Sequence, residues 1–520
     1  MKRRIRTTAA FSAAALLLAG SSCGGSRTEA GTQAATTTAT QMSVDTDKQL
    51  EEEIDWEGMA DIEKVDAADE EGTGSLYEPG KKAGLVKALC YYDIVASEPE
   101  ISEIFATRYG GTMETEITSS MEYFDKLSVL IASGLSPDLV RYDWAACPDG
   151  ISKGRYIPLD DWLDIDSPLW VEEKSVIESF NYLGKHYYFP SDIQTNFAII
   201  YNKRLVAEED MEDPMDLYFQ GRWTWDEFED MMKKWSQKGD DYIGFTGGSW
   251  SAMMFANTTG TKTIDFTGTD IVNNLRSAPV FSTMEWLTGL KQQGLIGNGF
   301  IHPGEAFVDG KLLFLGMGQK WGYESAQETA FKKNLDAEIA AVPFPRCPTA
   351  DKYYLSSDTF GYMVPSGAEN VQGAVQWILS SRLYETDPDI LAARRTEMMS
   401  TDPIYYAKCP SCKYDFAKNG KEELESCPEC GSARKEKYKP TYSEQQLDII
   451  DDMTNPEKFG LVFDGAVGFN NDFYNIFVGS EDTVFDGPLY FGLSYTQKIE
   501  EMNNMIEAYL QPYRDLLKVQ

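Results

Sequence analysis

The sequence predicts an α/β protein of two or more domains. From residue 84 to residue 140, short apolar runs that suit β-strands alternate with stretches of helical period, in the order strand, helix, strand, helix, strand. This alternation favours a parallel sheet covered by helices. At 520 residues, with 42% hydrophobic side chains, the chain can build more than one sizeable core.

The elements of this first unit follow from the residues. The strand GLVKALC starts at Gly84, and the helix after it ends at the pair Gly110-Gly111, a strong stop signal. METEIT forms a second strand, residues 124–131 carry the apolar spacing of a helix, and SPDLV, ending at Val140, forms a third strand. Further along, the same patterns predict a strand at residues 197–201 and helices at residues 271–290 and 499–517.

Residues 221–235, GRWTWDEFEDMMKKW, predict a well-capped amphipathic helix. Thr224 stands at the N-cap position, and Glu227 three residues later completes a capping box. Four apolar side chains then recur at helical spacing and form one face for a core. They are Phe228, Met231, Met232 and Trp235.

Charge and composition exclude several function classes. The net charge is −36, from 47 basic and 83 acidic residues, whereas nucleic-acid binding needs a basic surface. We therefore expect no nucleic-acid partner. Only two histidines occur, His186 and His302, which leaves little material for histidine-based catalysis or histidine-rich metal sites.

The N-terminus predicts export. A basic start precedes a short apolar run that cannot span a membrane, and Cys23 stands where a bacterial lipoprotein carries its diacylglyceryl group. The residues before Cys23 depart from the lipoprotein pattern at Gly20 and Ser22, so ordinary secretory cleavage near Ser22 is the alternative. Residues 24–83, rich in Thr and Ala and then acidic, predict a disordered tether.

Seven segments in order resemble one family. The Trp-Thr-Trp-Asp-Glu-Phe motif and six further blocks between residues 84 and 400 are similar to the family 1 extracellular solute-binding proteins, the sugar-capturing subunits of ABC importers. The other blocks are YFDKLSVLIASGLSPDLV (123–140), YIPLDD (156–161), HYYFPSDIQTNFAIIYNKRL (186–205), AFVDGKLLFLGMGQKW (306–321), EIAAVPFPR (338–346) and FGYMVPSGAENVQGAVQWILSSR (360–382).

The resemblance implies a two-lobed, periplasmic-binding-protein-like fold of type II with a hinge between the lobes. It also implies a monomeric, extracellular, lipid-anchored receptor that performs no chemistry and delivers a carbohydrate to the transmembrane subunits of an ABC permease. The implied divisions are a signal peptide (1–23), a tether (24–83), the first lobe (84–190 and 337–385) and the second lobe (191–336 and 386–520).

Ligand-binding candidates stand where the expected strands end, because open α/β sheets bind ligands beyond the carboxyl ends of their strands. A sugar has apolar ring faces and a rim of hydroxyl groups, so aromatic side chains beside carboxylates and amides suit it. The candidates are Tyr92, Asp93, Asp143, Trp144, Asn196, Trp250, Trp321, Tyr354 and Asp358. For each of them, ordinary packing or exposure is the alternative.

Four cysteines predict a metal site within residues 405–440. Cys409, Cys412, Cys427 and Cys430 form the pattern C-x2-C-x14-C-x2-C, which resembles a zinc ribbon. Four thiolates suit one tetrahedral zinc ion in a closed, structural site. Iron in a rubredoxin-like site and two disulfides are the alternatives.

Two other functions stay open at this point. A secreted carbohydrate-active enzyme would need a pair of carboxylates, and no such pair is recognisable from the sequence. A sensory or adhesion module could use the same lobes without transport; neighbouring permease genes would argue against it.

Overall fold

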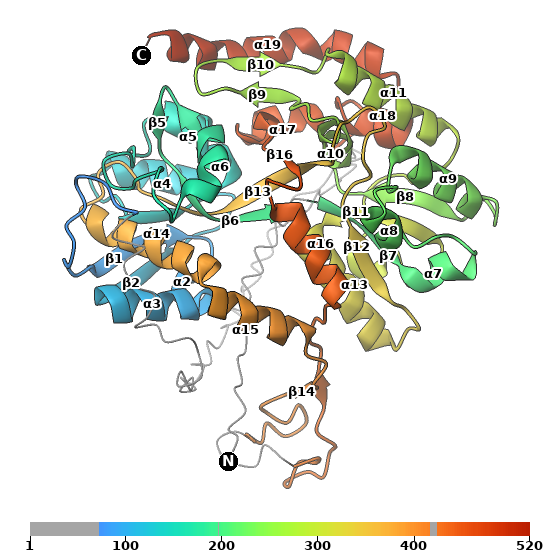
Figure 1. Ribbon diagram of the computed structural model, residues 1–520, viewed down its shortest axis with the longest axis horizontal. Coiled ribbons are helices and arrows are strands. Elements are labelled where there is room, and N and C mark those ends of the chain that lie inside the picture. Colours follow the sequence, from blue (N-terminus) through green and yellow to red (C-terminus); the bar gives the residue numbers. More distant parts are fainter. Residues whose placement is uncertain (1–71, 196, 417–423, 520) are drawn as a thin grey trace, which may run out of the picture.

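The computed structural model describes residues 72–195, 197–416 and 424–519 (Figure 1). The expected signal peptide, Cys23, residues 24–71 of the expected tether and Asn196 lie outside these ranges. In the described part, the chain forms two lobes that lie side by side, with strands running between them (Figure 1).

The first lobe is built on a six-stranded sheet in which β1 pairs in parallel with β2 and β3, and β13 pairs antiparallel with β3 and β6. Its strands are β1 (Gly84–Cys90), β2 (Gly111–Ile117), β3 (Leu139–Arg141), β6 (Phe189–Thr195), β13 (Tyr354–Met363) and β16 (Gly460–Val462). Its other elements are α2 (Ile94–Ser97), α3 (Pro99–Tyr109), α4 (Tyr123–Ala132), η3 (Trp144–Ala146), α5 (Asp149–Ser152), η4 (Val171–Glu173), α6 (Lys174–Ser179), the hairpin β4 (Asn181–Tyr182) and β5 (Lys185–His186), and α14 (Val371–Thr386).

The second lobe is built on a four-stranded sheet of order β12-β7-β11-β8. Its strands are β7 (Phe197–Asn202), β8 (Ile243–Gly247), β11 (Leu312–Gly318) and β12 (Ile339–Val342). Its other elements are α7 (Lys203–Glu208), α8 (Pro214–Phe219), α9 (Trp225–Ser236), α10 (Ser251–Asn257), the hairpin β9 (Ile264–Phe266) and β10 (Ile271–Asn273), α11 (Ala278–Gln292), α12 (Pro303–Ala306) and α13 (Gln319–Lys333).

The C-terminal segment crosses back and covers the second lobe. It comprises α15 (Pro388–Met399), β14 (Ile404–Tyr405), β15 (Glu436–Lys437), α16 (Glu444–Thr454), β16, η5 (Gly465–Val467), α17 (Asn471–Phe477), α18 (Asp486–Phe491) and α19 (Tyr495–Val519). Helix α19 runs across the top of Figure 1, where Arg514 donates to the carbonyl of Ile271 over 2.7 Å. It also reaches the first lobe, because the Tyr513 hydroxyl donates to Asp149 over 2.6 Å.

Helix α9 confirms the predicted core face but not the predicted cap. Phe228, Met232 and Trp235 have no exposed surface, and they help to fill the second lobe. Thr224 does precede the helix, but its side chain makes no capping hydrogen bond. Glu227 instead accepts a hydrogen bond from Arg222, so the predicted capping box is wrong.

The strands place the lobe boundaries differently from the sequence. Strand β6 stays with the first sheet up to Thr195, so the first crossing comes at residue 196 rather than 191. Strand β12 pairs with β7, so the return to the first lobe comes after Val342 rather than at residue 337. The folded part also starts before residue 84, because Gly74 donates to the carbonyl of Trp162 over 2.9 Å and Tyr77 is buried.

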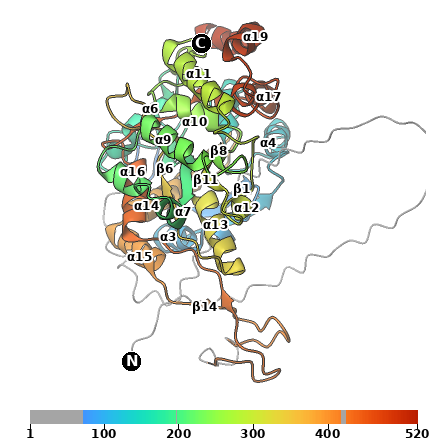
Figure 2. The same ribbon diagram turned by 90° about the vertical axis from the view of Figure 1, so that its right-hand side faces the viewer.

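The four-cysteine segment extends from the body between α15 and α16, as both views show (Figures 1 and 2). Its two ends meet in the pair β14 and β15.

No helix of the described ranges is long and apolar enough to span a membrane, and this includes α19, the 25-residue C-terminal helix.

Candidate functional site

The carboxyl ends of the strands from both lobes face one junction. In the second lobe, β11 ends at Gly318, opposite Phe197, where β7 begins after the crossing. In the first lobe, β13 pairs with the last residue of β3, Arg141, and also reaches Gln194 near the end of β6 through Asp358. The residues that follow β1, β3, β8 and β11 therefore gather around the crossing strands, the expected place for a ligand in open α/β sheets.

Arg141 is held at this junction by aromatic rings. Its guanidinium donates to the Tyr91 hydroxyl, and its central carbon lies 5.3 Å from the centre of the Tyr91 ring, 6.0 Å from that of Tyr92 and 5.2 Å from that of Phe360. Such rings attract a cation over their faces. Arg141 Nε is buried without a hydrogen-bond partner among the described residues. The rings fix the direction of a charged donor whose hydrogen-bonding capacity is not fully used.

Two carboxylates accompany Arg141, and a third stands on the crossing strand β6. Burial raises the pKa of Asp143 to about 6, against the attraction of Arg141, and Asp143 Oδ1 has no hydrogen-bond partner in the described part of the chain. Burial also raises the pKa of Asp358, whose side chain accepts a hydrogen bond from the amide of Thr359 over 2.8 Å. On β6, burial raises the pKa of Asp192 to about 8. Carboxylates with so few donors favour hydrogen-bond donors from a ligand.

The second lobe supplies nitrogen atoms to the same junction. Helix α13 starts directly after β11, and its first residues are Gln319, Lys320 and Trp321. Gln319 Nε2 is buried and lacks a partner among the residues described. Burial lowers the pKa of Lys320, whose charge also interacts with Asp192 and, from α15, Arg394. Donors of the second lobe thus stand near acceptors of the first.

Aromatic side chains connect the two lobes on a second side of the junction. The ring of Trp144, at the end of β3, lies 6.0 Å from that of Tyr474 on α17, and the ring of Trp250, after β8, lies 5.2 Å from the same tyrosine. Trp144 is half-buried, whereas Trp250 is only 4% exposed. Trp321 is also half-buried and packs edge-on against His302 at 5.6 Å. Trp144 and Trp321 therefore keep exposed ring surface, whereas Trp250 has almost none.

Four of the other expected residues are engaged in local structure. Asp93 is exposed and caps α2 by accepting the amide of Ala96 over 3.3 Å. The Tyr92 hydroxyl donates to Glu98 over 2.9 Å, and the Tyr354 hydroxyl donates to Asp351 over 2.9 Å. Trp250 belongs to the aromatic core, where it stacks on Phe477 and meets Phe485 edge-on. These four residues thus have partners within the chain, and Asn196 lies outside the described residues.

Sequence reasoning missed Arg141, Asp192, Lys320 and Tyr474. Arg141 could have been predicted from the sequence, because it is a charged residue directly after the apolar run of a strand and so stands at the carboxyl end of that strand. Lys320 stands next to Trp321 and shared its block of resemblance. Asp192 and Tyr474 gave no comparable signal, because their positions depend on pairing between β6 and β13 and on the packing of α17.

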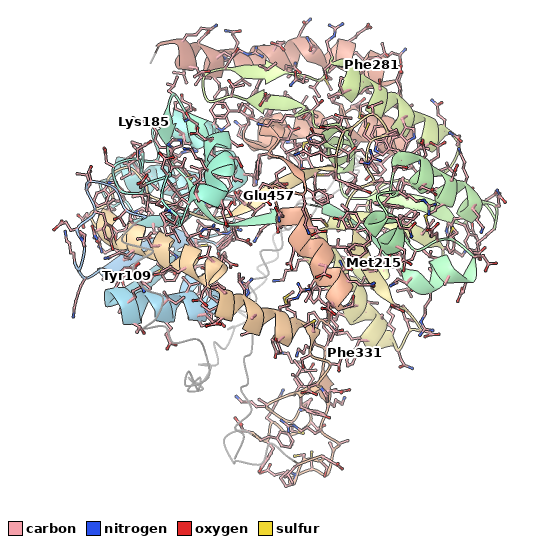
Figure 3. The ribbon with its side chains drawn as sticks, in the orientation of Figure 1. Tyr109, Lys185, Met215, Phe281, Phe331 and Glu457 are labelled. Carbon is pink, nitrogen blue, oxygen red and sulfur yellow. The ribbon has the colours of Figure 1, made fainter. Side chains whose placement is uncertain are left out.

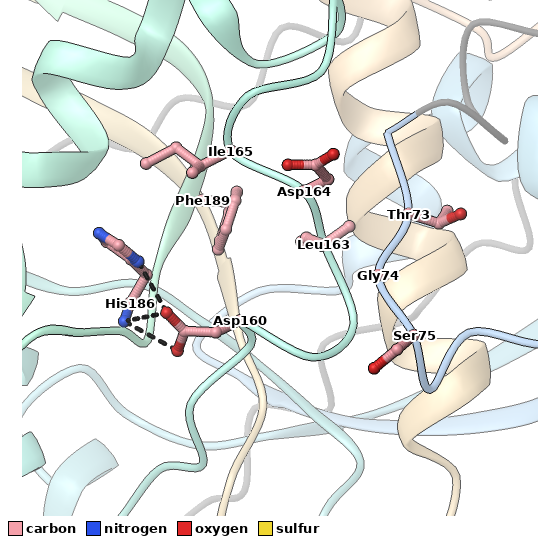
Figure 4. Close-up of a pocket in the computed structure, with 9 residues that line it drawn as sticks. All are labelled: Thr73, Gly74, Ser75, Asp160, Leu163, Asp164, Ile165, His186 and Phe189. Atoms are coloured by element: carbon pink, nitrogen blue, oxygen red, sulfur yellow. Dashed lines mark hydrogen bonds and ion pairs between the residues drawn. The ribbon is translucent and has the colours of Figure 1, made fainter.

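A separate hollow of about 600 Å³ lies on the flank of the first lobe (Figure 4). It is lined by residues 73–75 and 163–165, together with Asp160, His186 and Phe189. His186 Nδ1 lies 2.8 Å from Asp160, and His186 Nε2 lies 3.4 Å from Glu178, so this ring is held between two carboxylates. None of the residues at the junction lines the hollow, and its contacts are those of a structural histidine.

The four cysteines form the cluster that the sequence predicts. Their sulfur atoms lie within 4.8 Å of one another, with Cys409 and Cys430 3.7 Å apart and Cys412 and Cys427 3.4 Å apart. Four sulfurs at about 2.3 Å from one ion would be about 3.8 Å apart, whereas a disulfide needs about 2.05 Å. The spacing fits a tetrahedral metal ion.

The backbone repeats itself around the two cysteine pairs. The amide of Cys409 donates to Tyr414 and that of Cys427 donates to the equivalent Ser432, each over 2.8 Å. The residue after each pair, Lys413 and Gly431, has a positive φ of 64° and 70°. Hydrogen bonds from Ser432 lower the pKa of Cys430 to about 6, which favours a thiolate. Two equivalent turns therefore present their sulfurs to a common centre.

Two lobes with crossing strands and polar strand ends define the class of two-lobed solute-binding proteins. The ABC substrate-binding protein Lmo0181 from Listeria monocytogenes, solved with cycloalternan, matches with a TM-score of 0.53 at 14% identity, over 83% of this chain and 100% of that one. A cyclo/maltodextrin-binding protein complexed with maltotetraose matches with a TM-score of 0.55 at 13% identity, over 84% of this chain and 99% of that one. A solute-binding protein from Thermotoga lettingae bound with α-D-tagatose matches with a TM-score of 0.51 at 15% identity, over 84% of this chain and 100% of that one.

The sequence model of the family described as bacterial extracellular solute-binding protein matches residues 100–392, and this chain belongs to that family. The family and the fold expected from the sequence are thus confirmed. No curated protein matches the chain.

Proposed function

We propose that this protein captures a carbohydrate between its two lobes and delivers it to the membrane subunits of an ABC importer. The observation that carries the proposal is the junction itself. There, Arg141 and Asp143 of the first lobe and Gln319 of the second lobe each carry a buried donor or acceptor without a partner among the described residues. The charge of Lys320 in the second lobe also interacts with Asp192 of the first lobe. Structural neighbours bound to cycloalternan, maltotetraose and tagatose support the ligand class.

Sugar chemistry suits the composition of the junction. Each sugar hydroxyl donates one hydrogen bond and accepts others, so it can serve a carboxylate and a guanidinium together. The rings of Trp144 and Trp321 offer apolar faces for the C–H surface of a pyranose. Of the nine residues expected from the sequence, Asp143, Trp144, Trp321 and Asp358 remain the proposed ligand contacts, joined by Arg141.

The proposal includes a receptor without catalytic activity, held outside the cell. Cys23 would carry the lipid anchor, and residues 24–71 would connect it to the lobes. The receptor would act as a monomer, because its ligand lies between two lobes of one chain. Opening and closing about the crossing strands would control ligand entry and release.

The four cysteines would hold one structural zinc ion. Metal analysis of the purified chain should find about one zinc per chain, and Cys412→Ser should lose it. Iron in place of zinc would change the identity of the metal but keep the site. A mass lower by about four hydrogens, with no metal, would instead establish two disulfides and refute the metal site.

A thermal-shift screen against mono- and oligosaccharides tests the carbohydrate proposal. A ligand at about 100 times its dissociation constant adds about 2.7 kcal/mol of stability. We expect a shift with a saccharide and recovery of that saccharide intact. Recovery of cleaved sugar would favour a carbohydrate-active enzyme, and the lack of a shift across a broad panel would remove carbohydrate as the ligand class.

A further inference from the structure

The four-cysteine ribbon, residues 404–437, is inserted into a connection between the lobes. The chain leaves the first lobe through α14, continues into α15, passes through the ribbon, and returns as α16. Helix α16 then binds the second lobe, where Gln446 accepts the amide of Ala341 over 2.8 Å and donates to its carbonyl over 2.9 Å. The ribbon is therefore part of a connection between the lobes and not a surface loop of one lobe.

The segment that follows the ribbon, residues 438–442, is its exit segment, and hydrogen bonds fasten this segment to α13. The Tyr438 hydroxyl donates to the carbonyl of Glu324 over 2.9 Å, and Gln327 donates to the carbonyl of Thr441 over 2.8 Å. The Tyr442 hydroxyl donates to the Glu324 carboxylate over 2.7 Å. The ring of Tyr438 also packs at 5.9 Å from that of Phe331, which Figure 3 labels at the lower edge of the second lobe.

The same exit is fastened to α15. Lys439 forms an ion pair with Glu397 over 2.6 Å, and the amide of Tyr442 donates to the carbonyl of Met398 over 3.0 Å. Further along, Arg395 of α15 pairs with Asp451 of α16 over 2.6 Å. The residues after the ribbon thus tie α13 of the second lobe to the helix that comes from the first lobe.

Both fastened helices supply a charge to the junction. Lys320 is the second residue of α13, and Arg394 of α15 pairs with Glu385 over 2.6 Å. The charges of Lys320 and Arg394 act on each other and on Asp192, on a crossing strand. A change in the position of α13 relative to α15 would therefore change the junction.

The ribbon itself has only a small apolar core. Its buried apolar cluster consists of Cys409, Phe416 and Cys427, with Cys412 and Tyr414 packed beside them. Its backbone pairing is limited to the two-residue strands β14 and β15 and two single bridges, among the described residues. A module with so small a core folds through its metal bonds.

We propose that metal binding in the ribbon controls the interlobe junction, by ordering the exit segment (residues 438–442) that clamps α13 to α15. Metal and ligand binding are then coupled, and each changes the affinity of the other by the same factor, since linkage is reciprocal. Coupling of this kind is typically about 5- to 150-fold. The ligand part of the inference rests on the proposed capture of a carbohydrate, whereas the effect of metal on α13 rests only on the proposed metal site.

Hydrogen exchange of the full chain with zinc and after chelation tests the inference without any sugar. We expect chelation to raise exchange at least about tenfold in the ribbon and also in α13 and α15, while α9 of the second lobe keeps its protection. Loss of protection confined to residues 404–437 would overturn the inference.

Two variants separate coupling from local unfolding. Tyr438→Phe together with Gln327→Ala removes the hydrogen bonds of Tyr438 and Gln327 in the fastening but no metal ligand. Zinc should therefore still bind, while its effect on exchange in α13 becomes smaller. Tyr406→Phe is the matched control and should behave as the wild type, because Tyr406 is 43% exposed and its hydroxyl makes no hydrogen bond to any described residue. Zinc-dependent protection of α13 that is undiminished in the double variant would refute the exit segment as the route.

A saccharide found by thermal shift extends the test. Its dissociation constant should change at least about fivefold between the zinc-loaded and chelated chain, and this difference should become smaller in the double variant. An unchanged dissociation constant would refute coupling to the ligand. Failure of every saccharide to bind would refute the carbohydrate proposal, and the exchange result would still decide the effect of metal on α13.

Discussion

Replacing Glu98 with Gln should remove a pH dependence of stability from the first lobe. Glu98 is 5% exposed and accepts hydrogen bonds from the hydroxyls of Tyr92 and Tyr362. Burial raises its pKa from the ordinary 4.5 to about 7, although these two hydrogen bonds act in the opposite direction. The fold therefore favours the protonated carboxyl group.

The sign and the size of the effect follow from linkage. Because the pKa of Glu98 is higher in the folded than in the unfolded chain, its contribution is fully present below about pH 4.5 and is lost as pH rises to about 7. One pH unit corresponds to about 1.4 kcal/mol, so the loss amounts to about 3 kcal/mol. Gln resembles the protonated form and does not titrate.

Urea denaturation of wild type and Glu98→Gln from pH 4.5 to pH 8 measures this difference. The stability of the variant relative to the wild type should rise by about 3 kcal/mol across the range. Glu114→Gln, on the exposed face of β2, is the matched control and should run parallel to the wild type. Parallel curves for Glu98→Gln and wild type would refute the reasoning about burial.

Three further substitutions test the junction and its support. Trp144→Ala should weaken saccharide binding about tenfold in titration calorimetry, because a half-buried ring face is lost, and unchanged affinity would exclude Trp144 from the site. Saccharide affinity should fall by up to about tenfold per pH unit below pH 6 as Asp143 becomes protonated, and Asp143→Asn should abolish this dependence. Asp464→Ala should lower the free energy of unfolding, measured by urea denaturation, by about 3 kcal/mol or more. Asp464 is 5% exposed and accepts hydrogen bonds from the side chains of Asn257 over 2.8 Å and Thr263 over 2.9 Å. Asp240→Ala, at an exposed position, is the control and should change the free energy of unfolding little.

The sequence predicted the features that depend on local pattern. The core face of α9 and the order of the first strands and helices were readable, because hydrophobic spacing determines which side of an element is buried. The cysteine spacing predicted the cluster, since two tight turns bring four sulfurs together whatever surrounds them.

Features that depend on residues far apart in the chain could not be predicted from the sequence. The capping box failed because Glu227 found Arg222, a partner that the capping pattern does not consider. The ends of the lobes were misplaced because β12 pairs with β7, over 130 residues away in the chain. Trp250 was expected to bind the ligand, but α17 and the chain after it cover its ring. At the junction, the pairing of β6 with β13 decides which polar residues meet.

Small-angle X-ray scattering with and without a saturating saccharide tests the central claim most directly. Two lobes that close on a ligand about their crossing strands should give a smaller radius of gyration when the saccharide is bound, and Trp144→Ala should need a higher saccharide concentration for the same change. A saccharide that binds tightly, yet leaves the scattering curve unchanged, would contradict capture between the lobes.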